Sequence, residues 1–303
     1  MNTLKDQLKI LLLFPFYLVK LFIYLLKTDS DNLPGKEFAE FGYKTGLRLL
    51  FKGKFSPKLL LNPVSIVRYF EFDFVKSNLD LINELNILDV SSPYLFGFYL
   101  CRKEEVNYTY INPDKRDLDN VQALTNKLEF SGSYTTVCAD ARTLDYADNT
   151  FDVVLSISVI EHVNGDDDSR VMKELWRVIK SGGLLILTFP VKPVYEEEFR
   201  DDDIYKLDAV KKEEGYFFQR YYDDNKIEER LLSSLDNFKI IDKKVFGETS
   251  SNFYNGYKER WIKNGYSETV KDSYFISKYF RYFNNINKLK GIGVMGLTLK
   301  KIT

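Results

Sequence analysis

The chain has 303 residues, 45% hydrophobic and 29% charged, which is enough apolar material for a folded core and excludes general disorder. Lys and Arg number 43 against 44 Asp and Glu, so the formal net charge is −1 and no global positive field exists to attract nucleic acid as a partner. Two cysteines, Cys101 and Cys138, and one histidine, His162, are too few for a disulfide framework or a zinc cluster, so we expect no metal site.

The first predicted element is an apolar helix near the amino terminus. Residues 10–26 read ILLLFPFYLVKLFIYLL and are interrupted only by Pro15 and Lys20. At about 1.5 Å per residue this run is roughly 25 Å long, which is marginal for a bilayer core of about 30 Å. The following KTDSDNLPG offers no small-residue cleavage site, which argues against a secretory signal.

The lysines of this segment indicate how such a helix is used. A helix that turns by about 100° per residue places four of them within a sector of roughly 60°. They are Lys5, Lys9, Lys20 and Lys27. A basic stripe beside Leu, Ile and Phe is typical of a helix in the membrane interface, where lysine stems reach the headgroups. We therefore expect a cytoplasmic, peripherally membrane-associated protein. A spanning helix and a helix packed on its own domain or on a partner remain open, and Pro15 would kink any of them.

The next stretch links this helix to the main domain. Residues 36–62 are basic and punctuated by glycine, with KGKFSPK at their centre, and indicate a linker or a short surface helix. The dense apolar and aromatic positions from Pro63 onward predict a helix that caps the following domain. We divide the chain into a membrane-proximal amphipathic helix over 1–31, a helical or linker cap over 32–84 and a larger domain over 85–303.

From residue 86 onward predicted strands and helices alternate. Apolar or β-rich runs predict strands over 86–90, 106–111, 134–140, 151–158, 183–191, 238–248 and 291–301. The first helix between them has Ser92 as N-cap and Pro93 in its first turn. The charged, aromatic stretch 194–222 predicts a loop or lid. Alternation of this kind is typical of a parallel, right-handed sheet.

One stretch carries a family resemblance. Residues 138–190 contain CADARTLDYADNTFDVVLSISVIEHV and then KELWRVIKSGGLLILTFP. In these motifs, their order and their spacing, the chain resembles the class I S-adenosylmethionine (SAM) dependent methyltransferases, in particular their type 11-like small-molecule domains. The resemblance covers roughly residues 85–303. It implies an α/β fold with a Rossmann-like, doubly wound, seven-stranded and mostly parallel sheet, an antiparallel last strand, and a helical extension before it.

The resemblance also implies where SAM lies. In open α/β sheets a ligand binds beyond the carboxyl ends of the strands, where the strand order reverses. Residue by residue, the resemblance assigns cofactor contacts to Asp89, Ser91 and Ser92 after the first strand, Asn112 and Asp114 after the second, Asp140 and Ala141 after the third, and Ser156 and Ser158 at the fourth. Asp140 takes the position that meets the adenine amino group, and Asn112 or Asp114 could reach a ribose hydroxyl.

Two positions depart from the family's pattern. The loop that is glycine-rich in the family reads VSSPY over residues 90–94, with no glycine until Gly97, and Tyr110 stands where the ribose-binding acid belongs. Glycine there lets the backbone approach the cofactor closely. Free amides at a helix start and the hydroxyls of Ser91 and Ser92 offer a substitute. The open alternatives are a SAM pocket in altered form and a methyltransferase fold that no longer binds SAM.

The function follows from these residues. His162, directly after Glu161, is the candidate general base or the group that orients a substrate hydroxyl; the alternative is a loop histidine that holds backbone geometry. The acids at 166–168 indicate helix N-terminal charge rather than a metal site. We predict a SAM-dependent methyltransferase for a small-molecule, sugar or lipid-linked acceptor at the cytosolic membrane face. The alternative is a catalytically inactive methyltransferase-fold binding or scaffold protein, and the oligomeric state stays open.

Overall fold

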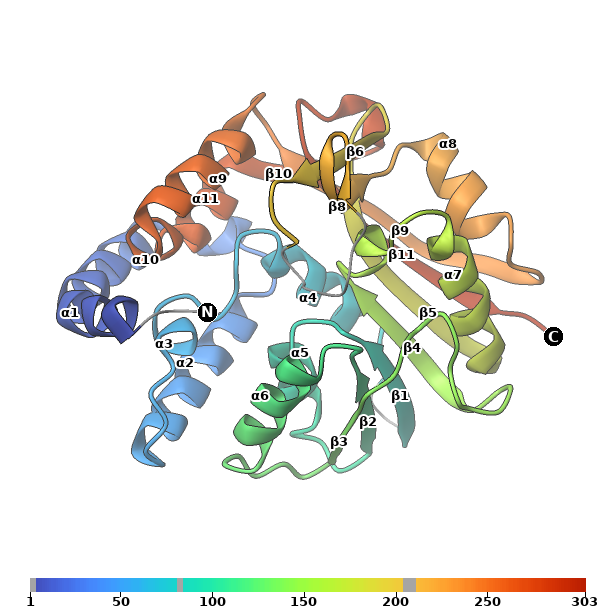
Figure 1. Ribbon diagram of the computed structural model, residues 1–303, viewed down its shortest axis with the longest axis horizontal. Coiled ribbons are helices and arrows are strands. Elements are labelled where there is room, and N and C mark those ends of the chain that lie inside the picture. Colours follow the sequence, from blue (N-terminus) through green and yellow to red (C-terminus); the bar gives the residue numbers. More distant parts are fainter. Residues whose placement is uncertain (1–3, 81–83, 204–210) are drawn as a thin grey trace. The chain divides into compact units, whose positions relative to one another are not determined.

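The chain forms two compact units, each assembled from separate stretches of sequence. The computed structural model describes residues 4–80, 84–203 and 211–303, with side chains from residue 8 onward. The helical unit comprises Met1–Asp73 and Glu248–Arg281, and the sheet unit comprises Phe74–Gly247 and Tyr282–Thr303 (Figure 1). The expected division at residues 31 and 84 stays a prediction. The structure groups residues Glu248–Arg281 with the amino-terminal helices.

A large mixed sheet defines the sheet unit. Within the described residues it has eight strands in the order β10-β9-β11-β5-β4-β1-β2-β3. These are β1 (Leu85–Val90), β2 (Val106–Ile111), β3 (Ser133–Val137), β4 (Phe151–Ile157), β5 (Ile179–Val191), β9 (Phe238–Glu248), β10 (Phe280–Phe283) and β11 (Gly293–Lys301). Strands β1 to β5 pair in parallel, and β11 lies antiparallel between β5 and β9. The Rossmann-like fold with an antiparallel last strand is confirmed, with β10 as an additional edge strand.

The core of this unit forms because one side of each helix is apolar. Helix α7 (Asp167–Val178) buries Val171, Met172 and Leu175 against the sheet, and the π-helix Ile227–Leu232 joins the same cluster. Strand β4 is buried along most of its length, as expected for a strand covered on both faces. The unit also contains helices α5 (Leu95–Leu100), α6 (Lys115–Thr125) and α8 (Asp224–Lys226) and the 3₁₀ helices Ile160–His162 and Ile286–Lys288.

Two local predictions in this unit are wrong. Helix α5 begins at Leu95 with Tyr94 as N-cap, because the Ser92 hydroxyl accepts a hydrogen bond from the Ile157 amide at 2.9 Å instead of capping the helix. The stretch predicted as a loop or lid contains β6 (Glu196–Arg200), β7 (Lys211–Lys212) and β8 (Gly215–Tyr221). These strands form an antiparallel sheet in the order β6-β8-β7.

The helical unit contains the amino-terminal helices and the helices of residues Glu248–Arg281. Its helices are α1 (Leu4–Lys27), α2 (Lys36–Phe51), α3 (Pro57–Leu61), α9 (Phe253–Asn264), α10 (Tyr266–Thr269) and α11 (Asp272–Tyr279), and α4 (Arg68–Ser77) begins in this unit. Helix α1 runs as one helix through Pro15. Its inner side packs Phe14, Tyr17 and Leu21 against Leu61 and Val270.

The expected lysine stripe of α1 does not form one surface. The Lys20 ammonium donates a hydrogen bond to the Ser267 hydroxyl of α10 at 2.7 Å, so it points into the helical unit. Burial and the nearby Lys271 lower the pKa of Lys20. Lys9 and Lys27 are exposed, whereas the side chain of Lys5 lies outside the described residues. The helical periodicity of the sequence places these lysines on one sector of the helix, but it does not tell which sector packs against the rest of the protein.

A buried carboxyl group lies at the start of α11. Asp272 accepts hydrogen bonds from the Tyr257 hydroxyl at 2.8 Å and from the Asn62 amide at 3.0 Å. Burial raises the pKa of Asp272 to about 8. This group therefore joins α3, α9 and α11 within the helical unit as a protonated acid at neutral pH.

Candidate functional site

The loops at the carboxyl edge of the parallel strands are bonded to one another. The amide and the hydroxyl of Ser91 both donate to the Ile111 carbonyl, at 2.8 and 3.0 Å, which joins the loop after β1 to the end of β2. The Ser92 hydroxyl ties the same loop to β4 through the Ile157 amide. The Asn112 amide donates to the Val137 carbonyl at 3.2 Å and connects β2 to β3. Four predicted site segments thus lie side by side.

The loop after β1 keeps a glycine-like backbone without a glycine. Ser91 has a φ of +53°, in the left-handed region that ordinarily favours glycine and costs other residues roughly 1–2 kcal/mol. The hydrogen bonds of Ser91 and Ser92 hold this conformation. Both hydroxyls are therefore engaged inside the loop, and α5 has only six residues and begins beyond it. The two hydroxyls that were expected to be available to the cofactor are therefore occupied within the chain.

Asp89, near the end of β1, holds the loop after β1 in place. Its side chain is fully buried and accepts hydrogen bonds from the Ser92 amide at 3.2 Å and from the Tyr108 hydroxyl at 2.6 Å. Burial raises the pKa of Asp89 to about 6. Gly97 lets α5 pack closely on the Tyr108 and Tyr134 rings, because a Cβ there would lie 2.5 Å from the first ring and 2.8 Å from the second. Asp89 is thus a structural anchor of the loop in this conformation.

An acid that the sequence analysis missed lies beside the end of β2. Asp117, in the first turn of α6, accepts hydrogen bonds from the Tyr110 hydroxyl at 2.8 Å and from the Asn112 side-chain amide at 2.9 Å. Asp114 instead caps α6 and holds the Arg116 guanidinium with both carboxylate oxygens. Asn112 is therefore the oriented polar group after β2. Asp117 could have been recognised in the sequence as an acid at the third position of the helix that follows β2.

Asp140, after β3, is held by a neighbouring arginine. The Arg142 guanidinium contacts both carboxylate oxygens of Asp140, at 2.6–3.1 Å, and also reaches Asp167 at 3.0 Å. Hydrogen bonds from Arg142 lower the pKa of Asp140. Both side chains are partly exposed, at 40% for Asp140 and 48% for Arg142. Ala141 lies beside them and packs against the core. Asp140 is therefore charged and accessible, but it is shared with Arg142.

The end of β4 contributes His162 and two serines. Ser156 is buried within β4, and Ser158 has a φ of +49° and donates its amide to the Thr188 carbonyl at 2.9 Å. His162 Nδ1 lies 2.6 Å from the Phe218 carbonyl oxygen of β8. Because a carbonyl only accepts, Nδ1 carries the proton, and Nε2 of the neutral ring is the basic nitrogen. This tautomer suits a general base.

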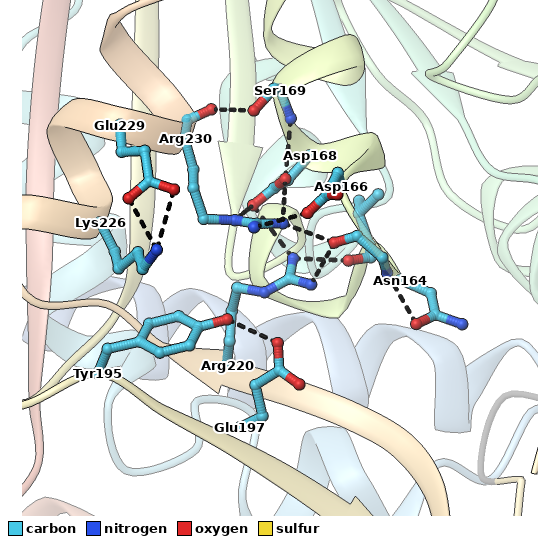
Figure 2. Close-up of polar contacts among 12 residues, drawn as sticks. Asn164, Asp166, Asp168, Ser169, Tyr195, Glu197, Arg220, Lys226, Glu229 and Arg230 are labelled. Carbon is cyan, nitrogen blue, oxygen red and sulfur yellow. Dashed lines mark hydrogen bonds and ion pairs between the residues drawn. The ribbon is translucent and has the colours of Figure 1, made fainter. Parts of the chain in front are cut away.

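The loop that directly follows His162 is fixed by a buried charge network (Figure 2). Arg220 of β8 donates to the Val163 carbonyl at 2.6 Å, the Gly165 carbonyl at 2.9 Å and Asp168 at 3.1 Å. Arg230, from the π-helix, contacts both carboxylate oxygens of Asp168 at 2.8 Å. The Arg220 and Asp168 side chains are fully buried. The interpretation of Asp168 as helix N-terminal charge is therefore incomplete, since it is the centre of this network.

Two features bear on metals and membranes. Among the described residues no group of three or more His, Cys, Asp or Glu is arranged to hold a metal ion, and Cys101 and Cys138 are free thiols.

By length and composition, Leu8–Lys27 of α1 could cross a membrane, with a mean hydropathy of 2.0 and only 6% of the segment buried. The helix is apolar on surfaces that the helical unit leaves uncovered.

Comparison with known sequences identifies the central part of the sheet unit. Residues 90–187 match the sequence model of a family described as a methyltransferase domain. An uncharacterized methyltransferase of Mycolicibacterium vanbaalenii is 38% identical over 86 residues, which are 28% of this chain and 31% of the relative. An uncharacterized protein of Methanocaldococcus jannaschii is 26% identical over 162 residues, which are 51% of this chain and 67% of the relative. The matches to the named methyltransferases thus span about a third of those relatives.

Solved structures agree at the level of the fold. The cyclase SpnF aligns with a TM-score of 0.51 and 18% identity, covering 79% of this chain and 84% of that one. The MccD protein aligns with a TM-score of 0.52 and 14% identity, covering 78% of this chain and 99% of that one. Because one of these proteins is named a cyclase, the fold alone does not specify the reaction.

Proposed function

Residues 90–187 belong to a class I SAM-dependent methyltransferase domain, as the sequence predicts, and from this premise we propose that the chain methylates a small-molecule, sugar or lipid-linked acceptor at the cytosolic face of a membrane. The observation that carries the proposal is the bonded carboxyl edge, where polar groups after β1, β2, β3 and β4 adjoin one another. This is the edge at which doubly wound sheets bind their ligands.

The residues at this edge fit the family's cofactor, SAM. The left-handed Ser91 keeps the backbone shape that glycine gives such loops, so the main chain can lie along the methionine end. Asn112, oriented by Asp117, would hold a ribose hydroxyl, and Asp140 would accept from the adenine amino group. When bound, SAM supplies an activated methyl group on a sulfonium leaving group. Ala141, Ser156 and Ser158 remain predictions, as supporting residues of the pocket.

Binding at Asp140 involves Arg142. The guanidinium occupies both carboxylate oxygens, so the adenine amino group must share Asp140 with Arg142 or displace it. Because the pair is nearly half exposed, releasing Arg142 costs about 1 kcal/mol or less. A charged acceptor hydrogen bond is worth about 1.5–3 kcal/mol, which exceeds that cost.

His162 is the proposed proton acceptor. Methyl transfer depends mainly on alignment of the nucleophile with the sulfur–methyl bond, so the side chains chiefly position the acceptor. With Nδ1 bonded to the Phe218 carbonyl, Nε2 can take a proton from an acceptor hydroxyl or amine as that group attacks. Glu161, whose Oε1 lies 3.6 Å from Nε2, would favour the charged ring that results.

The membrane part of the proposal rests on α1. The segment Leu8–Lys27 is apolar, largely uncovered and adjacent to exposed lysines, which supports in-plane binding to a bilayer. A helix whose inner side contacts Ser267 of α10 and Tyr274 of α11 is a poorer candidate to span, because those contacts would have to break or enter lipid. A lipid-linked acceptor would then be close to the domain.

One observation favours the second function, an inactive binding or scaffold protein. The hydroxyls of Ser91 and Ser92 and the carboxylate of Asp140 are all engaged within the chain. Methyl-labelled SAM, incubated with the full chain and either a membrane-lipid extract or a water-soluble extract, distinguishes the two. We expect label in the lipid fraction, and loss of transfer in His162→Ala with retained SAM binding. SAM binding without transfer to either extract would support the scaffold.

A further inference from the structure

Three basic side chains of the helical unit converge on one buried carboxylate. The Arg260 guanidinium of α9, through Nε at 2.7 Å, and the Lys271 ammonium both donate hydrogen bonds to Glu268 of α10. The Glu268 side chain is only 2% exposed. The Lys20 ammonium of α1 donates to the hydroxyl of Ser267, the residue before Glu268, at 2.7 Å. These three cations, here called the Lys20 cluster, come from α1, α9 and the N-cap of α11 and lie close to one acid.

The charges of the Lys20 cluster do not balance. Among the described residues, Glu268 is the one carboxylate in ion-pair contact with any of the three cations. Adjacent Asp272 adds no full negative charge at neutral pH, because burial raises its pKa to about 8. Lys20 bonds only a neutral hydroxyl, and burial together with the charge of Lys271 lowers its pKa. Three cations and one carboxylate thus leave an excess of two positive charges, which a bound anion would offset.

The Lys20 cluster lies on the flank of α1, between its packed side and its exposed apolar side. The packed side places Leu21 against the helical unit. The exposed side has five large apolar side chains that are 62–76% exposed: Leu12, Phe16, Val19, Phe22 and Leu26. At about 100° per residue, Lys20 lies roughly 100° from Leu21 and roughly 100° from the centre of the exposed group. A helix that lies in the membrane interface on its apolar side therefore holds Lys20 at the level of the headgroups.

Tyrosine rings lie beside the cluster. Tyr24, one turn after Lys20, packs against Tyr274 of α11 with ring centroids 5.4 Å apart. The ammonium groups of Lys27 and Lys271 lie 5.4 and 5.8 Å from the centroid of the Tyr24 ring. Lys27 therefore adds a further positive charge next to the cluster. Tyrosine and lysine side chains in such proximity are typical of the boundary between headgroups and acyl chains.

We propose that the Lys20 cluster binds a phosphate monoester carried by a membrane lipid. Such a group has a charge of about −1.5 to −2 near neutral pH, which matches the excess positive charge of the cluster. Among the described residues the terminal nitrogens of Arg260 make no hydrogen bond, and its side chain is 44% exposed, so they can donate to phosphate oxygens beside the two lysines. The inference rests on the proposed membrane-face function and extends it, because it gives the membrane contact a lipid preference.

The test measures co-sedimentation of the full chain with two kinds of phosphatidylcholine vesicle, matched in surface charge. One contains phosphatidic acid, a phosphate monoester, and the other contains phosphatidylglycerol, a diester. The wild type is expected to bind the phosphatidic acid vesicles about tenfold or more tightly. Lys20→Gln removes one charge of the cluster and is expected to bring this ratio close to one, whereas Lys20→Arg keeps the charge and the preference. Arg260→Gln is expected to act as Lys20→Gln does.

Matched controls come from the same helices. Lys9 is exposed on α1 and Lys263 is exposed on α9, and both lie outside the cluster. Lys9→Gln and Lys263→Gln remove the same charge as the cluster variants. A lysine near an anionic surface contributes about fivefold whatever the headgroup, so each control is expected to weaken binding to both vesicle types by at most this factor and to leave their ratio unchanged. Melting curves verify that every variant keeps its fold.

The outcomes separate this inference from the function on which it rests. If the wild type binds both vesicle types equally, or if Lys9→Gln changes the ratio as much as Lys20→Gln does, the phosphate site is wrong and membrane association stands. If the full chain ignores both vesicle types, both proposals fail, although methyl transfer to a soluble acceptor can persist. If the wild type shows no lipid preference but millimolar inorganic phosphate raises its melting temperature more than that of Lys20→Gln, the cluster takes a soluble phosphate and the lipid source is overturned.

Discussion

Replacing Arg220 by methionine tests whether the buried charges between β8 and α7 hold the loop that directly follows His162. Methionine keeps an unbranched apolar side chain, but it removes every donor of the guanidinium. The wild-type side chain is fully buried and donates to the carbonyls of Val163 and Gly165 and to Asp168. The variant therefore loses these bonds without leaving a large cavity.

The size of the stability loss depends on which partners Asp168 and the loop carbonyls keep in the variant. Removing one partner of a buried ion pair costs about 3–5 kcal/mol, because a buried charge is left uncompensated. Here Asp168 still has Arg230 at 2.8 Å and the Tyr222 hydroxyl at 3.0 Å, so the lower end applies. The Val163 carbonyl loses its charged donor, within the usual cost of about 1–3 kcal/mol for an unsatisfied buried group. We expect a loss of about 3 kcal/mol in the free energy of unfolding.

Urea denaturation followed by tryptophan fluorescence measures this loss. Trp176 is buried in α7 and reports on the sheet unit, and Trp261→Phe removes the half-exposed second reporter. With a slope of about 2 kcal/mol per molar urea, the midpoint should fall by about 1.5 M. Arg116→Met is the control, because its ion pair with Asp114 is on the surface and should matter by less than about 1 kcal/mol. An Arg220→Met midpoint equal to that of the control would refute the network argument.

Three further predictions address the cofactor edge and the helical unit. Asp140→Ala should weaken SAM binding in calorimetry by tenfold to more than a hundredfold at unchanged stability, whereas Arg142→Gln should not weaken it; equal effects would remove Asp140 from the site. Ser91→Val should lower stability by about 2 kcal/mol, because it loses the hydroxyl bond to Ile111 and crowds a β-branched side chain at φ +53°. Ser91→Gly loses the same bond but relieves the strain that serine already has there, so it should cost less than about 1 kcal/mol; equal melting curves would contradict this. The pKa of Asp272 is about 8 in the folded chain, against an ordinary value of 3.8, so between about pH 4 and 8 only the unfolded chain loses this proton. The free energy of unfolding of the wild type should therefore fall relative to that of Asp272→Asn over this range, by up to about 1.4 kcal/mol per pH unit. Parallel plots of stability against pH for the two proteins would be inconsistent with the buried acid.

The parallel sheet was predictable because its signals are local. A run such as FDVVLSI, now β4, is apolar at nearly every position, and only a strand covered on both faces accommodates that. The apolar face of α7 repeats at helical spacing, and residues Val171 and Leu175 are buried as expected. The small sheet from β6 to β8 was missed, since its strands carry charged and aromatic residues that resemble a surface loop.

The site was predictable in its residues but not in their contacts. Asp168 stands in a run of acids at a helix start, which indicates solvent exposure, yet Arg220 lies 52 positions away in the sequence and folds onto it. Nothing local tells that Ser91 adopts a left-handed conformation or that Arg142 folds back onto Asp140. Such pairings depend on which loops the sheet brings together, and this information is not contained in any short stretch of sequence.

Calorimetry of SAM, and of its demethylated product, with the full chain tests the central claim most directly. The claim is that the glycine-free loop, held by Ser91 and Ser92 over buried Asp89, still forms a cofactor pocket. The account predicts saturable binding of one SAM per chain. It also predicts a matching rise in melting temperature, since ligand at about 100 times its dissociation constant adds roughly 2.7 kcal/mol. No heat of binding and no thermal shift at millimolar ligand would contradict it and leave the fold as a scaffold.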